Sequence, residues 1–151
     1  MELEVLKKSK KPPMAGDIFV CKPQGHDYYF GRVIFLDGKL GGFNCMILYI
    51  YNASSKNPKE IPALDKGSLL LPPVGTNAKG WSLGYFETVE SRPLEKTDIL
   101  DGHSFYSKVR NSYFDEKGNL LPGPIEPVGG FGLDGIEGIG RQIGKKLGIT
   151  A

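Results

Sequence analysis

The aromatic and β-branched residues of this chain are concentrated in five short stretches, with clusters of glycine and proline between them. The stretches are DIFVCK (17–22), YYFGRVIFL (28–36), CMILYIY (45–51), GWSLGYFETVE (80–90) and HSFYSKV (103–109). β-Branched and aromatic side chains favour strands, whereas glycine and proline favour the turns that connect strands. The distribution therefore predicts a mainly β fold, of the β-rich α+β kind.

Two of these stretches, 28–36 and 45–51, are apolar on both of their alternating faces. A strand that is apolar on both faces belongs inside a sheet that is covered on both sides. Turn signals at 23–27 and 37–42 join the first three stretches in an antiparallel meander. This pattern predicts an antiparallel, strongly bent sheet or a small barrel.

The segment 80–90 alternates Trp81, Leu83 and Tyr85 on one side, which predicts a further strand. In the segment 66–74, two prolines are expected to end a short apolar strand. Past Pro127 glycines dominate the sequence, and apolar residues then recur at helical spacing. We therefore expect a loop followed by a short C-terminal helix that carries Ile136, Ile139, Ile143 and Leu147.

The chain has 151 residues, which matches the size of one domain, so a single domain over residues 1–151 is expected. Residues 1–13 contain the basic run KKSKK (7–11), followed by Pro12 and Pro13. This composition predicts a mobile basic N-terminal arm. No apolar run is long enough to cross a bilayer, and we expect a cytoplasmic protein without a membrane partner.

Two residues inside the predicted strand 28–36 stand out. Gly31 predicts a bulge or a close approach by another backbone. Arg32 lies in an apolar row, where an unpaired guanidinium costs several kcal/mol. It must therefore reach the edge of the sheet, pair with a carboxylate such as Asp17 or Asp27, or face a partner.

The spacing of acids, histidines and cysteines forms no catalytic set, so we predict a protein that is not an enzyme and has no catalytic, cofactor-binding or metal-ligating residue. Cys21 and Cys45 are expected to be buried free thiols, and neither His26 nor His103 is spaced to complete a metal site with them. His103 is interpreted as a hydrogen-bonded wall residue. An enzymatic reading would need a deep pocket that joins it to a carboxylate with a raised pKa.

The glycines at 130–135 fit the dinucleotide pattern G-x-G-x-x-G, but no strand is predicted before them and the match is set aside. The segment GIGRQIGKKL (138–147) resembles the hairpin glycines and second helix of a helix-hairpin-helix module. The alternative function is therefore a small β-barrel nucleic-acid-binding protein that uses this segment and Lys7 to Lys11. The formal net charge of +2 and the glycine-rich segment before 138 disfavour nucleic acid as a partner.

Over most of the chain, from about Gly16 to Leu147, the order of the segments resembles the immunity protein 26 family of bacterial polymorphic toxin systems. The segments that carry the resemblance are GDIFVCK, YYFGRVI, MILYIY, LLLPPVGTN, GWSLGYF, HSFY and a late glycine-rich stretch with KLG. The resemblance implies a mostly β cytoplasmic protein that is encoded beside a toxin and protects the producing cell by binding that cognate toxin.

A toxin-binding protein needs a rigid scaffold and a specific patch, and aromatic and arginine side chains dominate such patches. The predicted partner-binding residues are those that combine area with a polar end: Arg32, Trp81, Tyr85 and Tyr106. The sequence leaves the class of the toxin open.

Overall fold

The computed structural model describes residues 1–149. Its strands are β1 (Asp17–Cys21), β2 (Tyr28–Leu40), β3 (Phe43–Ser55), β4 (Leu69–Thr76), β5 (Glu87–Ser91), β6 (Ser104–Ser107), β7 (Ser112–Phe114), β8 (Leu120–Leu121) and β9 (Val128–Gly130). Its helices are α1 (Lys79–Ser82), the short 3-10 helix η1 (Lys96–Asp98) and α2 (Ile136–Leu147). The mainly β prediction is confirmed.

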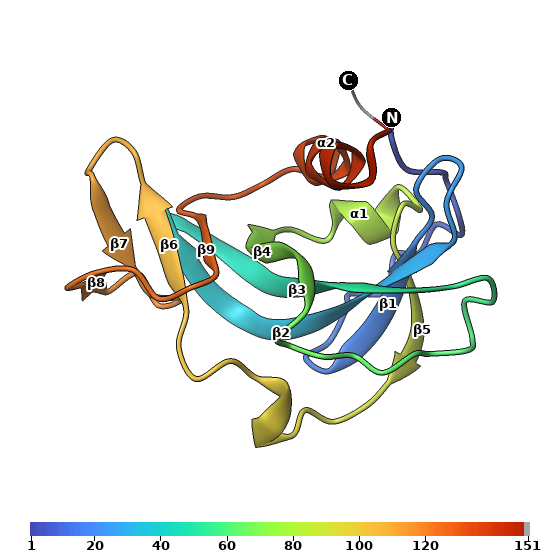
Figure 1. Ribbon diagram of the computed structural model, residues 1–151, viewed down its shortest axis with the longest axis horizontal. Helices are drawn as coiled ribbons and strands as arrows, with labels where there is room; N and C mark the ends of the chain where they lie inside the picture. The colour runs from blue at the N-terminus through green and yellow to red at the C-terminus, as the bar shows by residue number, and fades with distance from the viewer. Residues whose placement is uncertain (150–151) are drawn as a thin grey trace.

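The strands form two sheets that lie at different ends of the molecule (Figure 1). The larger sheet has the order β4-β3-β2-β1-β5 and is antiparallel throughout, so β2 and β3 are central, as predicted. The smaller sheet has the order β8-β7-β6-β9, and its β6–β9 pair is parallel. Neither sheet closes on itself, so the bent sheet is the correct alternative and the small barrel is wrong.

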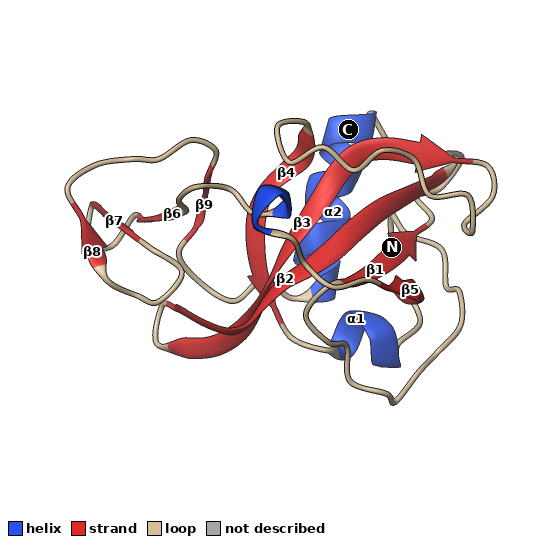
Figure 2. Cartoon of the chain, turned by 90° about the horizontal axis from the view of Figure 1, so that it is seen from below, coloured by secondary structure: helices blue, strands red, loops and turns tan. Residues whose placement is uncertain are grey.

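The long β2–β3 hairpin gives the larger sheet its bend (Figure 2). The register between the two strands shifts at several points, and each shift inserts a kink and extra twist. The hairpin closes at Gly41 and Gly42, which both have positive φ, the conformation required by the tight turn that matches strand twist. Its end reaches the smaller sheet, where the Lys39 N–H donates to the Glu116 carbonyl at 2.9 Å.

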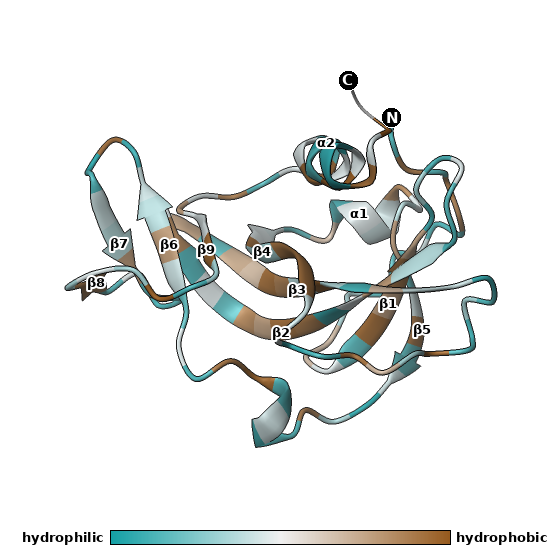
Figure 3. Cartoon of the chain, in the orientation of Figure 1, coloured by the Kyte–Doolittle hydropathy of each residue, from teal (hydrophilic) through white to brown (hydrophobic). Residues whose placement is uncertain are grey.

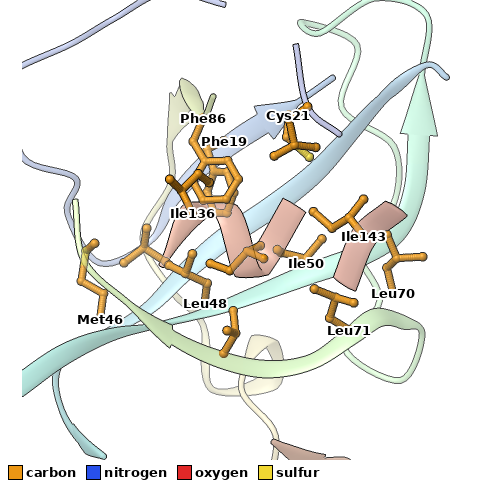
Figure 4. Packing of buried hydrophobic residues seen from close by; sticks show 14 of the residues in the cluster. Phe19, Cys21, Met46, Leu48, Ile50, Leu70, Leu71, Phe86, Ile136 and Ile143 are labelled. Atoms are coloured by element: carbon orange, nitrogen blue, oxygen red, sulfur yellow. The ribbon is translucent and has the colours of Figure 1, made fainter. Parts of the chain in front are cut away.

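Hydrophobic residues run along β1, β2 and β3 (Figure 3) and are covered on both faces. One face packs against α2 and Trp81 of α1, and Figure 4 shows Ile136 and Ile143 of α2 beside Leu48 and Ile50 of β3. The other face is covered by loop residues that include Leu64, Leu94, Ile99 and Leu100. The spacing predicted for the C-terminal helix is confirmed by the burial of Ile136, Ile139 and Ile143.

Two strand predictions are wrong in part. In 80–90, Trp81 lies in α1 and Gly84 adopts a φ of 86°, so the chain turns and only Glu87–Ser91 is a strand. β4 runs through Pro72 and Pro73 to Thr76 instead of ending there. Proline lacks an N–H, and an edge strand such as β4 tolerates it because one side of that strand has no ladder partner to satisfy.

The glycine patterns of the C-terminal region also differ from expectation. β9 directly precedes the glycines at 130–135, contrary to the prediction, but it pairs in the smaller sheet whereas α2 packs on the larger one. That arrangement is not the strand–turn–helix unit of a dinucleotide site. Gly138 and Gly140 lie inside α2, so the helix-hairpin-helix interpretation of 138–147 is wrong.

The N-terminal segment contacts the body of the molecule at several points. Leu3 is buried and forms a β-bridge with Pro23. The N–H of Leu6 donates to the Gly84 carbonyl, and that of Ser9 to the Trp81 carbonyl. The mobility of residues 1–13 stays a prediction, and these contacts argue against it for the part up to Ser9.

Candidate functional site

The structure separates the four residues predicted to bind a partner. Arg32 and Trp81 are each only 2% exposed, whereas Tyr85 and Tyr106 are half-buried. Tyr85 packs against the core beside α2, and Tyr106 lies on β6 in the smaller sheet. Partner binding by these residues stays a prediction, and burial argues against it for Arg32 and Trp81.

Arg32 is paired within the protein. Its Nη1 lies 3.1 Å from Oδ2 of Asp98. The sequence had suggested Asp17 or Asp27 as the carboxylate partner, and it did not indicate Asp98. Its Nε donates to the Gly16 carbonyl, and its Nη2 donates to the carbonyls of Arg92 and Pro93. These acceptors compensate the guanidinium for the loss of water on burial. Through the same contacts, Arg32 holds the 92–98 loop against β2.

Trp81 anchors the core. Its ring packs edge-on against Phe19 and Phe86, with centroids 5.0 and 5.1 Å away. Its indole N–H donates to Oγ1 of Thr88 at 3.0 Å, which satisfies its single polar atom.

A concave surface that offers exposed charged and apolar groups lies where the smaller sheet meets the β2–β3 turn. It is a cavity of ≈ 610 Å³ between that turn, the β6–β7 turn and the 115–119 turn. We call it the hairpin groove, and its lining includes Lys39, Gly41, Val109, Arg110, Lys117 and Phe131. Tyr106 belongs to the strand that leads into the β6–β7 turn.

The hairpin groove is positively charged. Lys39, Arg110 and Lys117 line it, and Lys108 is exposed in the same β6–β7 turn. Within residues 1–149, none of these four cations forms an ion pair with a carboxylate. The Arg110 guanidinium lies over the Phe114 ring, 4.7 Å from its centroid, which orients it without neutralising it.

Apolar side chains border the same cations. Val109, at the tip of the β6–β7 turn, is 96% exposed, and Phe43, beside the β2–β3 turn, is 56% exposed. Single exposed apolar residues are ordinary on protein surfaces. Val109 lines the concave, cationic groove, and Phe43 follows Gly42, which also lines it. Such a combination suits contact with another macromolecule.

A buried polar cluster lies between the two sheets. Nε2 of His103 is hydrogen-bonded to the Tyr49 hydroxyl at 2.5 Å, and its Nδ1 lies 3.7 Å from Oε2 of Glu116. The Tyr49 hydroxyl also accepts from the Leu100 N–H. The prediction that His103 is a hydrogen-bonded wall residue is confirmed.

Burial sets the ionisation of this cluster. It lowers the pKa of His103 below 6.5, an effect that the nearby Glu116 carboxylate partly opposes. It also raises the pKa of Tyr49 to about 12, so that hydroxyl stays protonated at neutral pH. The histidine is therefore held in its neutral form between two sheets.

Both cysteines are free and buried, as predicted, and burial raises the pKa of the Cys21 thiol to about 12. Residues 1–149 contain no group of three or more histidine, cysteine, aspartate or glutamate side chains that could hold a metal ion. Over the same residues, no helix has the length and apolar character to cross a membrane.

Sequence reasoning missed the hairpin groove because its lining comes from segments that only the fold brings together. One local signal was present: Val109 stands between Lys108 and Arg110 at the end of a predicted strand. An apolar residue flanked by cations in a turn is not buried by the turn itself, and it therefore indicates an exposed contact point.

The chain was compared with known proteins. No curated protein and no solved structure matches it. The family model described as immunity protein 26 matches residues 14–115, from the segment before β1 to the turn after β7. The match covers more than half of the chain and bears out the resemblance found in the sequence. The chain therefore belongs to the immunity protein 26 family.

Proposed function

We propose that this protein is an immunity protein that neutralises a cognate bacterial polymorphic toxin in the cytoplasm by direct protein–protein binding. The observation that carries the proposal is the family match over residues 14–115. The role requires a rigid scaffold and a specific surface but no reactive group. We accordingly propose that the protein acts without catalysis.

The described part of the chain is consistent with such a scaffold. Hydrophobic residues are buried on both faces of the larger sheet, and the side chains of Arg32 and Trp81 form hydrogen bonds within the protein. Of the four residues predicted from the sequence, Tyr106 is the best placed to assist binding, because it lies on the hairpin that borders the hairpin groove. The nucleic-acid alternative depended on a barrel and a helix-hairpin-helix segment, and both are wrong.

The test is co-expression of this chain with the polymorphic toxin encoded beside it, with cell survival and co-purification scored together. An unrelated toxin in the same host is the control. Survival that depends on the cognate toxin, with a stable complex, supports the proposal. Survival without a complex would contradict direct binding, and death of cells that contain folded protein would contradict immunity against that toxin.

A further inference from the structure

We propose that the hairpin groove is the toxin-binding surface and that it receives an acidic segment of the partner protein that also carries apolar side chains. This inference rests on the proposed function and adds the surface and the chemistry of the partner. Three features carry it: cations that form no ion pair, hydrogen-bonded turns and the exposed aliphatic side chain of Val109.

The positive charges of the groove form no ion pair within residues 1–149, although Arg110 also contacts the Phe114 ring. Lys39, Lys108, Arg110 and Lys117 are exposed, and within residues 1–149 they have no carboxylate partner. Charges that converge on one concave surface raise the local concentration of an oppositely charged partner and speed its association. A cluster of this sign attracts anionic groups, and in a protein partner these are the carboxylates of Asp and Glu.

The carboxylates nearest in sequence are directed to other partners. Oδ1 of Asp115 accepts from the N–H groups of Lys117 and Asn119, so it holds its own turn together. Oε2 of Glu116 faces the buried His103 ring. Asp37 is exposed on β2 but does not line the hairpin groove. Within residues 1–149, none of these three carboxylates forms an ion pair with a cation of the groove.

The turns around the groove are ordered before any partner arrives. The Arg110 N–H donates to the Ser107 hydroxyl at 3.2 Å, and the Tyr106 hydroxyl donates to Oδ1 of Asn111 at 2.7 Å. Asn111 itself adopts a φ of 47°, which closes the β6–β7 turn. A surface that is already ordered loses less conformational entropy on binding, so a larger part of the contact energy appears as affinity.

The aromatic rings near the groove distinguish a protein partner from a nucleic acid. Tyr106 packs on Tyr113 with ring centroids 5.1 Å apart, and Phe114 stacks on Phe131 at 4.3 Å. Proteins that bind single-stranded nucleic acid offer free ring faces on which unpaired bases stack. Rings that pack on one another leave fewer such faces. The exposed apolar tip is instead Val109, an aliphatic residue that suits an apolar side chain of a protein segment.

The first experiment uses probes in place of the toxin. Backbone amide NMR signals of the full chain are followed during titration with a short Glu- and Leu-containing peptide, with a Lys- and Leu-containing peptide of the same pattern, and with single-stranded oligothymidylate. The proposal predicts shifts in residues 39–43 and 107–118 with the acidic peptide alone. Shifts confined to other residues, or stronger binding of the oligothymidylate at the groove, would overturn it.

The second experiment uses matched charge reversals in the toxin-binding assay. The groove variant carries Lys39→Glu, Arg110→Glu and Lys117→Glu, and the control carries Lys7→Glu, Lys8→Glu and Lys10→Glu. Both change the formal charge equally, at exposed residues. The groove variant is expected to raise the toxin Kd by about tenfold or more, because exposed charge pairs each contribute modestly and their signs are reversed. The control should bind like the unmodified chain.

A milder variant protects this test against misfolding. Lys39→Gln, Arg110→Gln and Lys117→Gln remove charge without adding repulsion, and they are expected to weaken binding less than the reversals do. If the unmodified chain protects cells and both groove variants bind as tightly as it does, the groove is not the binding surface although the immunity function stands. If the unmodified chain fails to protect, the proposed function fails, and the acidic-peptide titration still decides the chemistry of the groove.

Discussion

At the scale of single residues, Arg32 shows how one charge organises the chain around it. Its guanidinium is almost fully buried, yet it contacts Asp98 and three backbone carbonyls from segments far apart in the sequence. Removing one partner of a buried, hydrogen-bonded ion pair leaves the groups that it contacted without compensation. Arg32 is therefore a structural residue of this protein, whatever its partner.

Arg32→Met is expected to lower the free energy of unfolding by about 3–5 kcal/mol, because it leaves buried acceptors without a donor. The matched control is Arg92→Met, which removes an exposed ion pair with Glu90 and should cost less than about 1 kcal/mol. Urea unfolding of both variants checks the difference. Equal losses in the two variants would show that the buried contacts of Arg32 do not stabilise the fold.

His103 makes stability depend on pH in a defined direction. Its pKa is lowered from 6.5 in the folded protein, mainly by burial, so the unfolded chain binds a proton more readily. The stability that the neutral His103 contributes is complete above pH 6.5. It is lost as the pH falls from there toward the pKa of His103 in the folded protein. Glu116 opposes the shift and so reduces the effect.

His103→Gln should therefore flatten the fall in the free energy of unfolding below pH 6.5 relative to the unmodified protein. His26→Gln, at the other histidine, is the control and should keep the original slope. Denaturant unfolding at a series of pH values gives the slopes. A slope unchanged in His103→Gln would contradict the assignment.

At the scale of elements, the close packing of β2 on β1 depends on the missing side chain of Gly31. A Cβ at Gly31 would lie 2.3 Å from Cζ of Phe19, whose ring itself packs against the rings of Trp81 and Phe86. The bulge predicted at Gly31 is confirmed by the register shift between residues 29 and 31, whereas the group that approaches Gly31 is the Phe19 side chain and not another backbone. The missing side chain lets β2 carry the Phe19 ring over its backbone.

Gly31→Ala is expected to cost about 1–3 kcal/mol of stability, because a buried and confined ring cannot move aside freely. Gly123→Ala is a suitable control, since a Cβ there would meet no atom within 4 Å. Thermal unfolding compares the two. An unchanged midpoint in Gly31→Ala would mean that the packing around Phe19 is looser than the structure shows.

The same scale shows what the sequence could and could not predict. β2, β3 and α2 were predictable because their periodicity extends over many residues. Trp81 to Tyr85 was misassigned because alternation over a few residues does not show that Gly84 will turn the chain with positive φ. The hairpin groove was beyond prediction, since Lys39, Arg110 and Lys117 meet only through pairings between distant segments.

At the scale of the whole molecule, the two sheets have different characters. The larger sheet and its helices hold most of the buried hydrophobic residues, whereas the smaller sheet, with the β2–β3 turn, carries the cations of the hairpin groove and the exposed Val109. The buried cluster of Tyr49, His103 and Glu116 connects the two. A stable core that supports a polar, ordered rim is the arrangement expected of a protein that acts by binding.

The measurement that tests this account most directly is hydrogen–deuterium exchange of the full chain, alone and in complex with its cognate toxin. Toxin binding through the hairpin groove predicts slower exchange over residues 39–43 and 107–118, with α2 and β5 unchanged. Protection confined to α2 or β5, in a complex that stays intact, would contradict the groove as the binding surface.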